Sequence, residues 1–313
     1  VFGVLTAMCG ISGIMYKNSR HQGLAPVGND LVRMLDSLAH RGHDSTGYTI
    51  VGENNDGQLI LRIWTGESEH PDVILARAQE AVEQVGGVVN SRQAWGGFLR
   101  LNLNYEGEIP ELAEAILQTK GVVIHSIGEA SEVIKDVGTA SDMEPRHQVG
   151  SLKGTHGIGH VRMATESKVD ITHSHPFWAY PFTDVTVVHN GQLTNYHKLK
   201  RHYQDVGGYR FLTENDSELI AVYLADKLAQ GDSLTDALKY SLEELDGTFT
   251  YLVSTKDGIG VAKDRWAAKP LVTMETDDVV AVASEEIALR SVFTDQELDR
   301  AEPQENEVLT WSV

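Results

Sequence analysis

The chain contains one cysteine, Cys9, which follows Met8 and precedes Gly10 and Ile11. A single thiol excludes an internal disulfide and a cysteine-rich metal site, so Cys9 is either an unreactive side chain buried in the core or a reactive group. A thiol is a good nucleophile only when deprotonated, and no His or Lys adjoins Cys9 in the sequence to act as its base. A reactive Cys9 therefore needs a base from elsewhere.

The α-amine of Cys9 is one such base, provided that translation starts at Met8 and this methionine is removed. An α-amine has an unperturbed pKa of about 7.7–8.0, which suits general base catalysis near neutral pH. One residue would then carry both the nucleophile and its base. On this hypothesis residues 1–8 are a mis-called start or a leader that is removed, and residues 9–313 form the mature domain.

Further motifs follow Cys9-Gly10-Ile11 along most of the chain. They are HRGHDSTG (40–47), GHVRMAT (159–165), VHNG (188–191), NDSE (215–218), AKDR (262–265), KPL (269–271) and ASE (283–285). Their types and order resemble the class II glutamine amidotransferases, which use an N-terminal nucleophile to release ammonia from glutamine. The resemblance implies an α+β fold, a four-layer αββα sandwich of the N-terminal-nucleophile hydrolase type.

The resemblance also implies a role for several residues. The motif 159–165, with Arg162 and Thr165, is similar to the family's binding motif for the glutamine α-carboxylate. Asn190 and Gly191 lie in the motif that resembles the oxyanion hole, and Asp216 lies in the motif that resembles the α-ammonium site.

The chemistry of glutamine supports the same roles. Attack on the side-chain amide creates an oxyanion, which the Asn190 side-chain N–H and the Gly191 backbone N–H can stabilise. Arg162 can hold a carboxylate bidentately, and Asp216 can pair with an ammonium group. A simpler interpretation remains open for each residue. Arg162 could be a surface arginine, Asp216 a helix N-cap, and Asn190-Gly191 an ordinary hairpin turn after a strand at 185–189.

The sequence departs from the family pattern at two places. Met163 stands where many members have Trp, and Glu166-Ser167 where many have His-Gly; Glu166 adds a carboxylate near that of the substrate.

His173 and His175 could hold a metal, but no third ligand lies at useful spacing, so we expect no metal site. The chain also lacks a glycine-rich phosphate loop and a dinucleotide fingerprint, so we expect no cofactor.

Composition excludes several classes of protein. The 313 residues are 41% hydrophobic, which allows a full core, and the net charge of −19 argues against nucleic-acid binding. No window approaches the roughly 18 apolar residues of a membrane span, and no basic region of a signal peptide precedes Cys9. We therefore expect a cytoplasmic protein.

Hydrophobic periodicity predicts the elements that must position these residues. A helix is expected from an N-cap at Asp30, and two β-rich runs at 47–51 and 59–65 are expected to form a hairpin. Residues 67–153 are interpreted as an insertion, with helices at 72–85 and 109–119, a strand at 121–126 and a polar loop through 144–147. Further helices should begin near Asp216 and Ser233. Strands are expected at 155–161, 185–189, 248–254, 258–263, 271–275, 279–283 and 308–312.

The given sequence stops at Val313, after these motifs and without a synthase domain, which predicts a separate glutaminase-type subunit. We expect L-glutamine as substrate and, as partner, the synthase subunit of a glutamate synthase-like or N-methylglutamate synthase-like complex. The insertion 67–153 is a candidate for docking that partner, and residues 162–181 for a loop that closes over glutamine. Two alternatives remain: an N-terminal-nucleophile amidase with another substrate, and a regulatory subunit whose Cys9 stays blocked.

Overall fold

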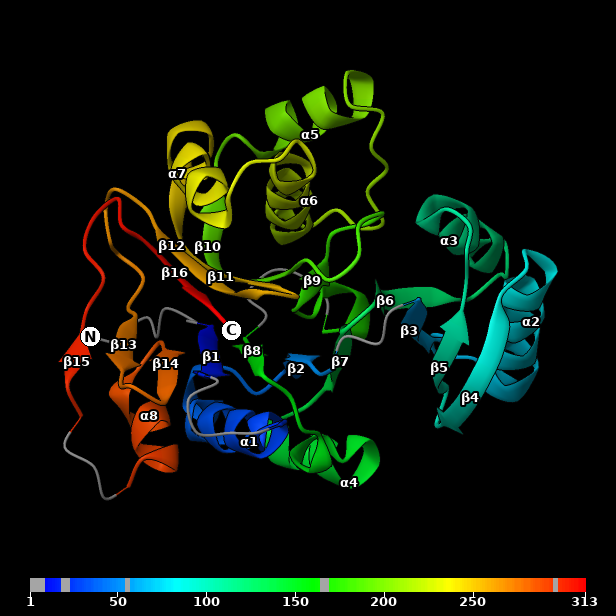
Figure 1. The fold of residues 1–313 in the computed structure, drawn as a ribbon, viewed down its shortest axis with the longest axis horizontal. Coiled ribbons are helices and arrows are strands. Elements are labelled where there is room, and N and C mark those ends of the chain that lie inside the picture. The colour runs from blue at the N-terminus through cyan, green and yellow to red at the C-terminus, as the bar shows by residue number, and fades with distance from the viewer. Residues whose placement is uncertain (1–8, 18–22, 54–56, 164–168, 295–297) are drawn as a thin grey trace, which may run out of the picture.

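Two β-sheets packed face to face form the centre of the computed structural model, which describes residues 9–17, 23–53, 57–163, 169–294 and 298–313 (Figure 1). In spatial order, the first sheet contains β15 (Arg300–Ala301), β13 (Val272–Glu275), β14 (Val279–Ala283), β1 (Gly10–Tyr16), β8 (His156–Arg162), β2 (Ser45–Val51) and β7 (Ser131–Val137). The second contains β16 (Val308–Ser312), β12 (Gly258–Lys263), β11 (Gly247–Thr255), β10 (Thr186–Leu193) and β9 (Phe177–Trp178). Within the described residues, the paired strands of both sheets run antiparallel.

Helices cover the outer face of each sheet. The first sheet carries α1 (Val27–Ser37), α4 (Ala140–His147) and α8 (Glu286–Val292), and the second carries α5 (Tyr196–Asp205), α6 (Asp216–Ala229) and α7 (Leu234–Glu244) (Figure 1). Short 3-10 helices lie at Ala39–Arg41, Val149–Ser151 and Ile171–His173. The predicted α+β fold, a four-layer αββα sandwich, is confirmed. No helix in the described ranges is long and apolar enough to cross a lipid bilayer.

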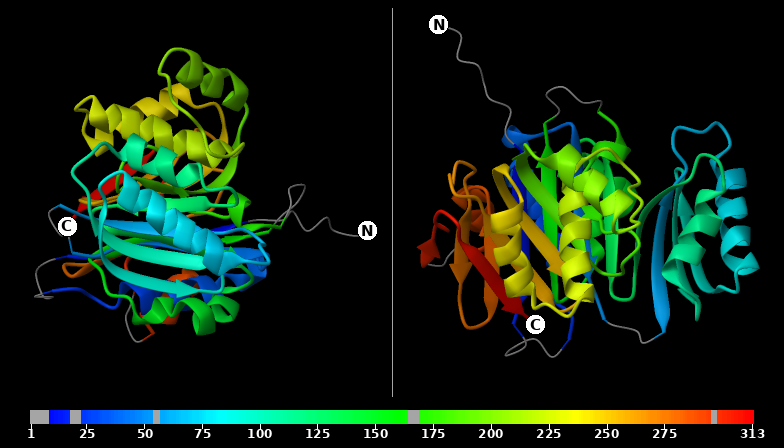
Figure 2. Two further views of the ribbon diagram at one scale, coloured as in Figure 1. Left: turned by 90° about the vertical axis from the view of Figure 1, so that its right-hand side faces the viewer. Right: turned by 90° about the horizontal axis from the view of Figure 1, so that it is seen from above.

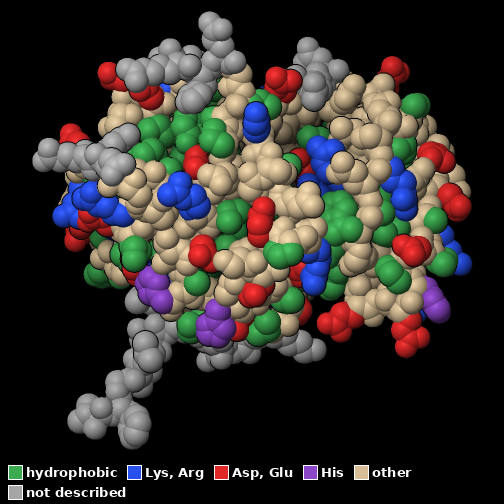
Figure 3. All heavy atoms as spheres, turned by 90° about the horizontal axis from the view of Figure 1, so that it is seen from below, with side chains coloured by type: hydrophobic (Ala, Val, Ile, Leu, Met, Phe, Trp, Pro, Cys, Tyr) green, Lys and Arg blue, Asp and Glu red, His purple; other side chains and the backbone are tan. Residues whose placement is uncertain are grey.

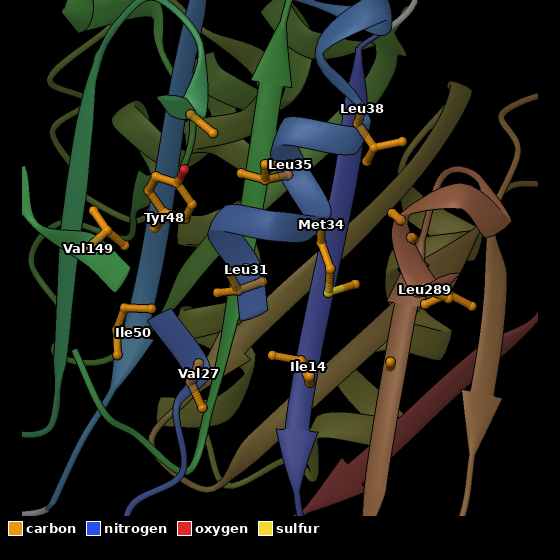
Figure 4. Close-up of a cluster of buried hydrophobic side chains, with 14 of the residues drawn as sticks. Ile14, Val27, Leu31, Met34, Leu35, Leu38, Tyr48, Ile50, Val149 and Leu289 are labelled. Atoms are coloured by element: carbon orange, nitrogen blue, oxygen red, sulfur yellow. The ribbon is translucent and has the colours of Figure 1, made fainter. Parts of the chain in front are cut away.

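Separate apolar layers hold the sandwich together. Ile11, Ile158 and Leu252 are buried between the two sheets, where the facing strands alternate apolar side chains. Under α1, the side chains of Leu31 and Leu35 pack against the first sheet, as Figure 4 shows. Burying such side chains stabilises the fold by about 1.5–3 kcal/mol each. The strand that follows Cys9 is therefore fixed on both of its faces.

A four-stranded sheet forms a separate lobe, Gln58–Gly128, beside the sandwich (Figure 2). Its elements in chain order are β3 (Gln58–Trp64), α2 (Pro71–Gln84), β4 (Val88–Trp95), β5 (Phe98–Asn104), α3 (Ile109–Leu117) and β6 (Val123–Gly128). The spatial order β4-β5-β3-β6 with antiparallel pairing is that of a split βαβ, or ferredoxin-like, unit. Its apolar core lies between one face of the sheet and the two helices. The predicted insertion 67–153 also includes β7 and α4 of the sandwich, and its boundaries stay a prediction.

Three sequence-based predictions about elements are wrong. The runs at 47–51 and 59–65 do not form a hairpin, because β2 pairs with β7 and β8 whereas β3 pairs with β5 and β6. Helix α1 begins at Val27 with Pro26 as its N-cap, so Asp30 lies in its first turn. Residues 144–147 form the end of α4, because a capping box between Thr139 and Asp142 starts a helix that accommodates Pro145.

Candidate active site

Cys9 lies directly before β1, where two side chains from distant segments hold its carbonyl oxygen. Arg41 Nε donates to this oxygen over 3.0 Å, and Asn190 Nδ2 donates to it over 3.1 Å. In β1, two residues after Cys9, the backbone N–H of Ile11 donates to Ser284 Oγ over 3.0 Å. The backbone around Cys9 is therefore fixed by groups from three separate parts of the chain.

A cavity of about 610 Å³, the Cys9 pocket, opens at this point between the ends of β8 and β10 and the start of α6. Its lining residues are Cys9, Arg162, Met163, His175, His189, Gly191, Gln192, Leu193, Tyr196, His197, Glu214, Asn215, Asp216 and Ser217. The pocket thus brings together four of the residues singled out from the sequence, and Asn190 joins them through its bond to Cys9. Thr165 lies outside the described residues.

The Asn190-Gly191 pair lies within a strand and not at a hairpin turn, contrary to the simpler interpretation. β10 continues to Leu193, and Gly191 pairs with Phe249 of β11. Gly191 has a φ of +147°, and a Cβ at this position would lie 2.1 Å from the carbonyl oxygen of Thr248. Only glycine fits this conformation, so the strand presents its backbone to the pocket at this point.

The surroundings of Cys9 keep its thiol protonated at neutral pH. Burial raises the pKa of the Cys9 thiol above the ordinary value of 9.0, although the Met163 backbone N–H and the cations Arg162, Lys269 and Arg41 act in the opposite direction. The thiol therefore needs a base before it can attack.

Asp216 is the first residue of α6, and its carboxylate is ionised. Asn215, not Asp216, caps the helix, because the Asn215 side chain accepts from the backbone N–H of Ser217. Burial acts to raise the pKa of the Asp216 carboxyl, but His189 and the hydrogen bond from the Leu193 amide over 2.9 Å bring it below its ordinary value. A partly buried negative charge, with the Asp216 side chain 21% exposed, therefore faces the pocket that also contains Arg162, which is 6% exposed.

Three buried histidines gather at the pocket, and none was assigned a role in the glutamine reaction from the sequence: His175 and His189 line the pocket, and His160 packs on His175. The rings of His160 and His175 stack with centroids 4.0 Å apart, and the His189 backbone N–H donates to His175 Nδ1 over 3.1 Å. Ser217 Oγ lies 3.0 Å from His189 Nδ1. Burial and neighbouring charges lower the pKa of His160 to about 3 and that of His175 well below 6.5, so both rings are neutral. The available signal was that His160 and His189 lie in motifs 159–165 and 188–191, whereas His175 lies outside both motifs.

An ion pair supports the backbone of Cys9. Arg41 is 5% exposed, and its guanidinium bonds the carboxylate of Glu285, which His40 Nε2 also approaches at 3.0 Å. The motifs HRG and ASE, which are distant in sequence, thus meet beside Cys9. Neither motif has a role that the sequence alone predicts, because their meeting point depends on the pairing of β14 with β1.

The two histidines considered for a metal have separate surroundings. His173 Nδ1 lies 2.8 Å from Asp170 Oδ1, whereas His175 packs on His160. Within the described ranges, no group of three or more His, Cys, Asp or Glu residues is placed to hold a metal ion.

The chain is similar to known proteins in sequence and in fold. Residues 160–291 match the family model described as glutamine amidotransferase domain. The chain is 40% identical to a putative glutamine amidotransferase of Methanothermobacter thermautotrophicus, over 95% of this chain and 98% of the relative. It is 36% identical to the glutamine amidotransferase-like protein GlxB of Rhizobium meliloti, over 97% of this chain and 98% of the relative.

A solved structure has the same fold at low sequence identity. It is the glutamine phosphoribosylpyrophosphate amidotransferase of B. subtilis, complexed with ADP and GMP, with a TM-score of 0.60 and 21% identity. The match covers 97% of this chain and 47% of that structure, so the chain spans about half of its length. The two relatives matched over nearly their full length show that the chain belongs to the glutamine amidotransferase family.

Proposed function

We propose that the chain hydrolyses the side-chain amide of L-glutamine at Cys9 and supplies the ammonia to a partner synthase subunit. The observation that carries this proposal is the Cys9 pocket, in which a thiol, a buried arginine and a partly buried carboxylate face one cavity. A glutaminase needs these three groups, since glutamine combines an amide with an α-carboxylate and an α-ammonium group. We further propose a glutamate synthase-like or N-methylglutamate synthase-like complex as the assembly that uses the ammonia.

The α-amine of Cys9 is the proposed base, freed when residues 1–8 are absent. It takes the thiol proton while Sγ attacks the amide carbon, and the resulting ammonium returns a proton to the leaving nitrogen as the C–N bond breaks. Ammonia leaves and a thioester remains. Water, activated by the same amine, then attacks the thioester carbon, the C–S bond breaks, and glutamate and the thiol are released. The raised pKa of the Cys9 thiol supports the need for such a base.

Asn190 and Gly191 are the proposed oxyanion donors. Asn190 Nδ2 carries two hydrogens and donates one of them to Cys9 O, so the other is available to a substrate oxygen beside the thiol. The absence of a Cβ at Gly191 lets the substrate lie against the strand. Each such donor contributes about 3–4 kcal/mol to transition-state stabilisation.

Arg162 and Asp216 are the proposed partners of the substrate's two charged groups. Arg162 pairs with the α-carboxylate in a bidentate geometry, and Asp216 with the α-ammonium. The burial of Arg162 and the partial burial of Asp216 strengthen both interactions relative to water. Thr165 is a further proposed contact to the carboxylate.

The test combines the intact mass of the protein with a glutaminase assay, in the presence of a candidate synthase subunit and its acceptor. We expect a chain that begins at Cys9 to release ammonia and glutamate, and Cys9→Ala to abolish this release. The matched control is the same chain with residues 1–8 retained, which should be inactive. Equal activity of the two forms would exclude the α-amine as base, and activity of Cys9→Ala would exclude Cys9 as nucleophile. An unchanged glutaminase rate on adding the synthase subunit would count against that partner.

A further inference from the structure

The sheet of the lobe has one face without helices, and this face differs from the other in its chemistry. Leu61 on β3 and Leu101 on β5 point toward α2 and α3 and are fully buried. Because side chains alternate along a strand, Arg62 and Arg100 point to the opposite face, where their Cα atoms are partners across the β3–β5 pair. The open face of the lobe therefore carries paired arginines, and neither α2 nor α3 covers it.

A cavity of about 680 Å³ lies between this open face and helix α4, and we call it the arginine cavity. Its lining residues are Arg62, Gln93, Ala94, Trp95, Arg100, Arg146, His147, Gln148, Ser151 and Leu152. None of these lining residues is acidic, although the whole chain has 45 acidic against 26 basic residues. Figure 3 views this side of the molecule and shows Lys and Arg side chains along the junction between the lobe and the sandwich.

The carboxylates that neutralise these arginines lie outside the cavity lining. Glu132 of β7 is 6% exposed and accepts from Arg62 Nε over 2.6 Å and from Arg100 Nε over 2.8 Å. Asp136, also of β7, is 2% exposed and pairs with Arg146. Three guanidinium groups thus share two buried carboxylates, which leaves positive charge facing the cavity.

Donors remain available in this cavity after the internal bonds are counted. The side chain of Arg146 is 55% exposed, and one of its terminal nitrogens bonds Asp136. Gln93 and Gln148 add amide N–H groups at the lining. Trp95 provides an apolar wall, with the Arg62 guanidinium 5.3 Å from its ring centroid. The size of the cavity is within the range of small-ligand sites, about 300–1,000 Å³.

We propose that the arginine cavity binds a small molecule through a carboxylate or phosphate group. Planar guanidinium groups match the two oxygens of such anions, and a lining without carboxylates presents no repulsion to them. The cavity is separate from the Cys9 pocket, since the two share no lining residue. The proposal does not depend on the reaction at Cys9.

The test measures binding of inorganic phosphate, adenosine monophosphate and citrate to the full chain by calorimetry at low salt. We expect at least one probe to bind with a dissociation constant below about 1 mM, and which of the three binds distinguishes phosphate from carboxylate recognition. Arg146→Gln should weaken this binding about 10-fold or more, because a charge-assisted hydrogen bond is lost. The matched control is Arg92→Gln, the same change on an exposed side chain of β4 outside the cavity lining.

A second control separates the arginine cavity from the Cys9 pocket. The probe should bind Arg162→Gln as tightly as it binds the unchanged protein. The proposal is overturned if no probe binds with a dissociation constant below about 1 mM. It is also overturned if Arg146→Gln has no effect, if Arg92→Gln weakens binding equally, or if Arg162→Gln abolishes binding.

Discussion

The Cys9 pocket and the arginine cavity both present guanidinium groups to a small molecule, but their carboxylates are placed differently. In the Cys9 pocket, Asp216 lines the same cavity as Arg162. In the arginine cavity, Glu132 and Asp136 bind the arginines from outside the lining. Opposite charges in one cavity favour a zwitterion such as an amino acid, whereas carboxylates behind the lining leave a site for anions. The position of the counter-charge, more than the number of arginines, distinguishes the two sites.

Replacing Asn190 by Ala should give the largest effect, because it removes the side chain proposed as an oxyanion donor at the Cys9 pocket. We expect kcat for glutamine hydrolysis to fall about 100- to 1,000-fold with KM nearly unchanged. Steady-state kinetics of a chain that begins at Cys9 would measure this, with a thermal melt to exclude unfolding after loss of the bond to Cys9 O. A rise in KM without a fall in kcat would assign Asn190 to substrate binding.

Asp216→Asn should test whether the Cys9 pocket recognises both charged groups of a zwitterion or only its anionic group. The Asn side-chain oxygen still accepts from the Leu193 amide, but the negative charge is lost. We expect kcat/KM for glutamine to fall about 10- to 100-fold, the usual effect of losing one charge-assisted hydrogen bond. The matched substrate is the glutamine analogue without its α-amine, for which wild type and variant should be equal. An equal loss with both substrates would mean that Asp216 acts through α6 and not on the ammonium group.

The pH dependence of Cys9 alkylation should show how far the Cys9 pocket excludes water. In a chain that retains residues 1–8, burial raises the thiol pKa, so less thiolate exists at neutral pH than in an unfolded chain. We expect the iodoacetamide reaction to increase with pH to a midpoint above 9.0, and the same protein in denaturant to show a lower midpoint. The midpoint is the measured quantity because burial also slows the absolute rate. A native midpoint at or below the denatured one would contradict a protonated thiol.

The sequence predicted the Cys9 pocket better than the arginine cavity for a physical reason. Catalysis requires particular residue types in short stretches, so Cys9, Arg162 and Asp216 were recognisable in their motifs before their positions were known. The arginine cavity is formed by side chains spread from residue 62 to residue 152, and it exists only because β3 and β5 pair in register beside α4. Nothing in the spacing of these residues indicates that they meet.

The wrong predictions about elements have a similar origin. Strand β4 was missed because its side chains are mostly exposed on both faces and give no clear alternation. The runs around 47–51 and 59–65 are both strands, but local pattern does not specify that each pairs in a different sheet. At 144–147, Pro145 suggested a loop, whereas the capping box at Thr139 was the stronger signal.

The smallest expected effect is that of Arg146→Gln on glutamine hydrolysis, and it tests whether the two sites are independent. Asp136 keeps its bond to His147 over 2.9 Å when Arg146 is replaced, so β7 should not move. The next residue, Lys135, points to the other face of β7 and donates to the carbonyl oxygens of Ser174 and Pro176. These two residues flank His175, which lines the Cys9 pocket.

Distant sites without shared partners usually affect each other by less than about 0.5 kcal/mol, so kcat/KM of Arg146→Gln should stay within about 2-fold of the unchanged protein. Kinetics with saturating and limiting glutamine would measure it, with Arg92→Gln as the control for a lost surface charge. A larger change confined to Arg146→Gln would mean that β7 transmits the occupancy of the arginine cavity to His175. The cavity would then be a regulatory site and not an independent one, because β7 is bonded to the arginines on one face and to the backbone around His175 on the other.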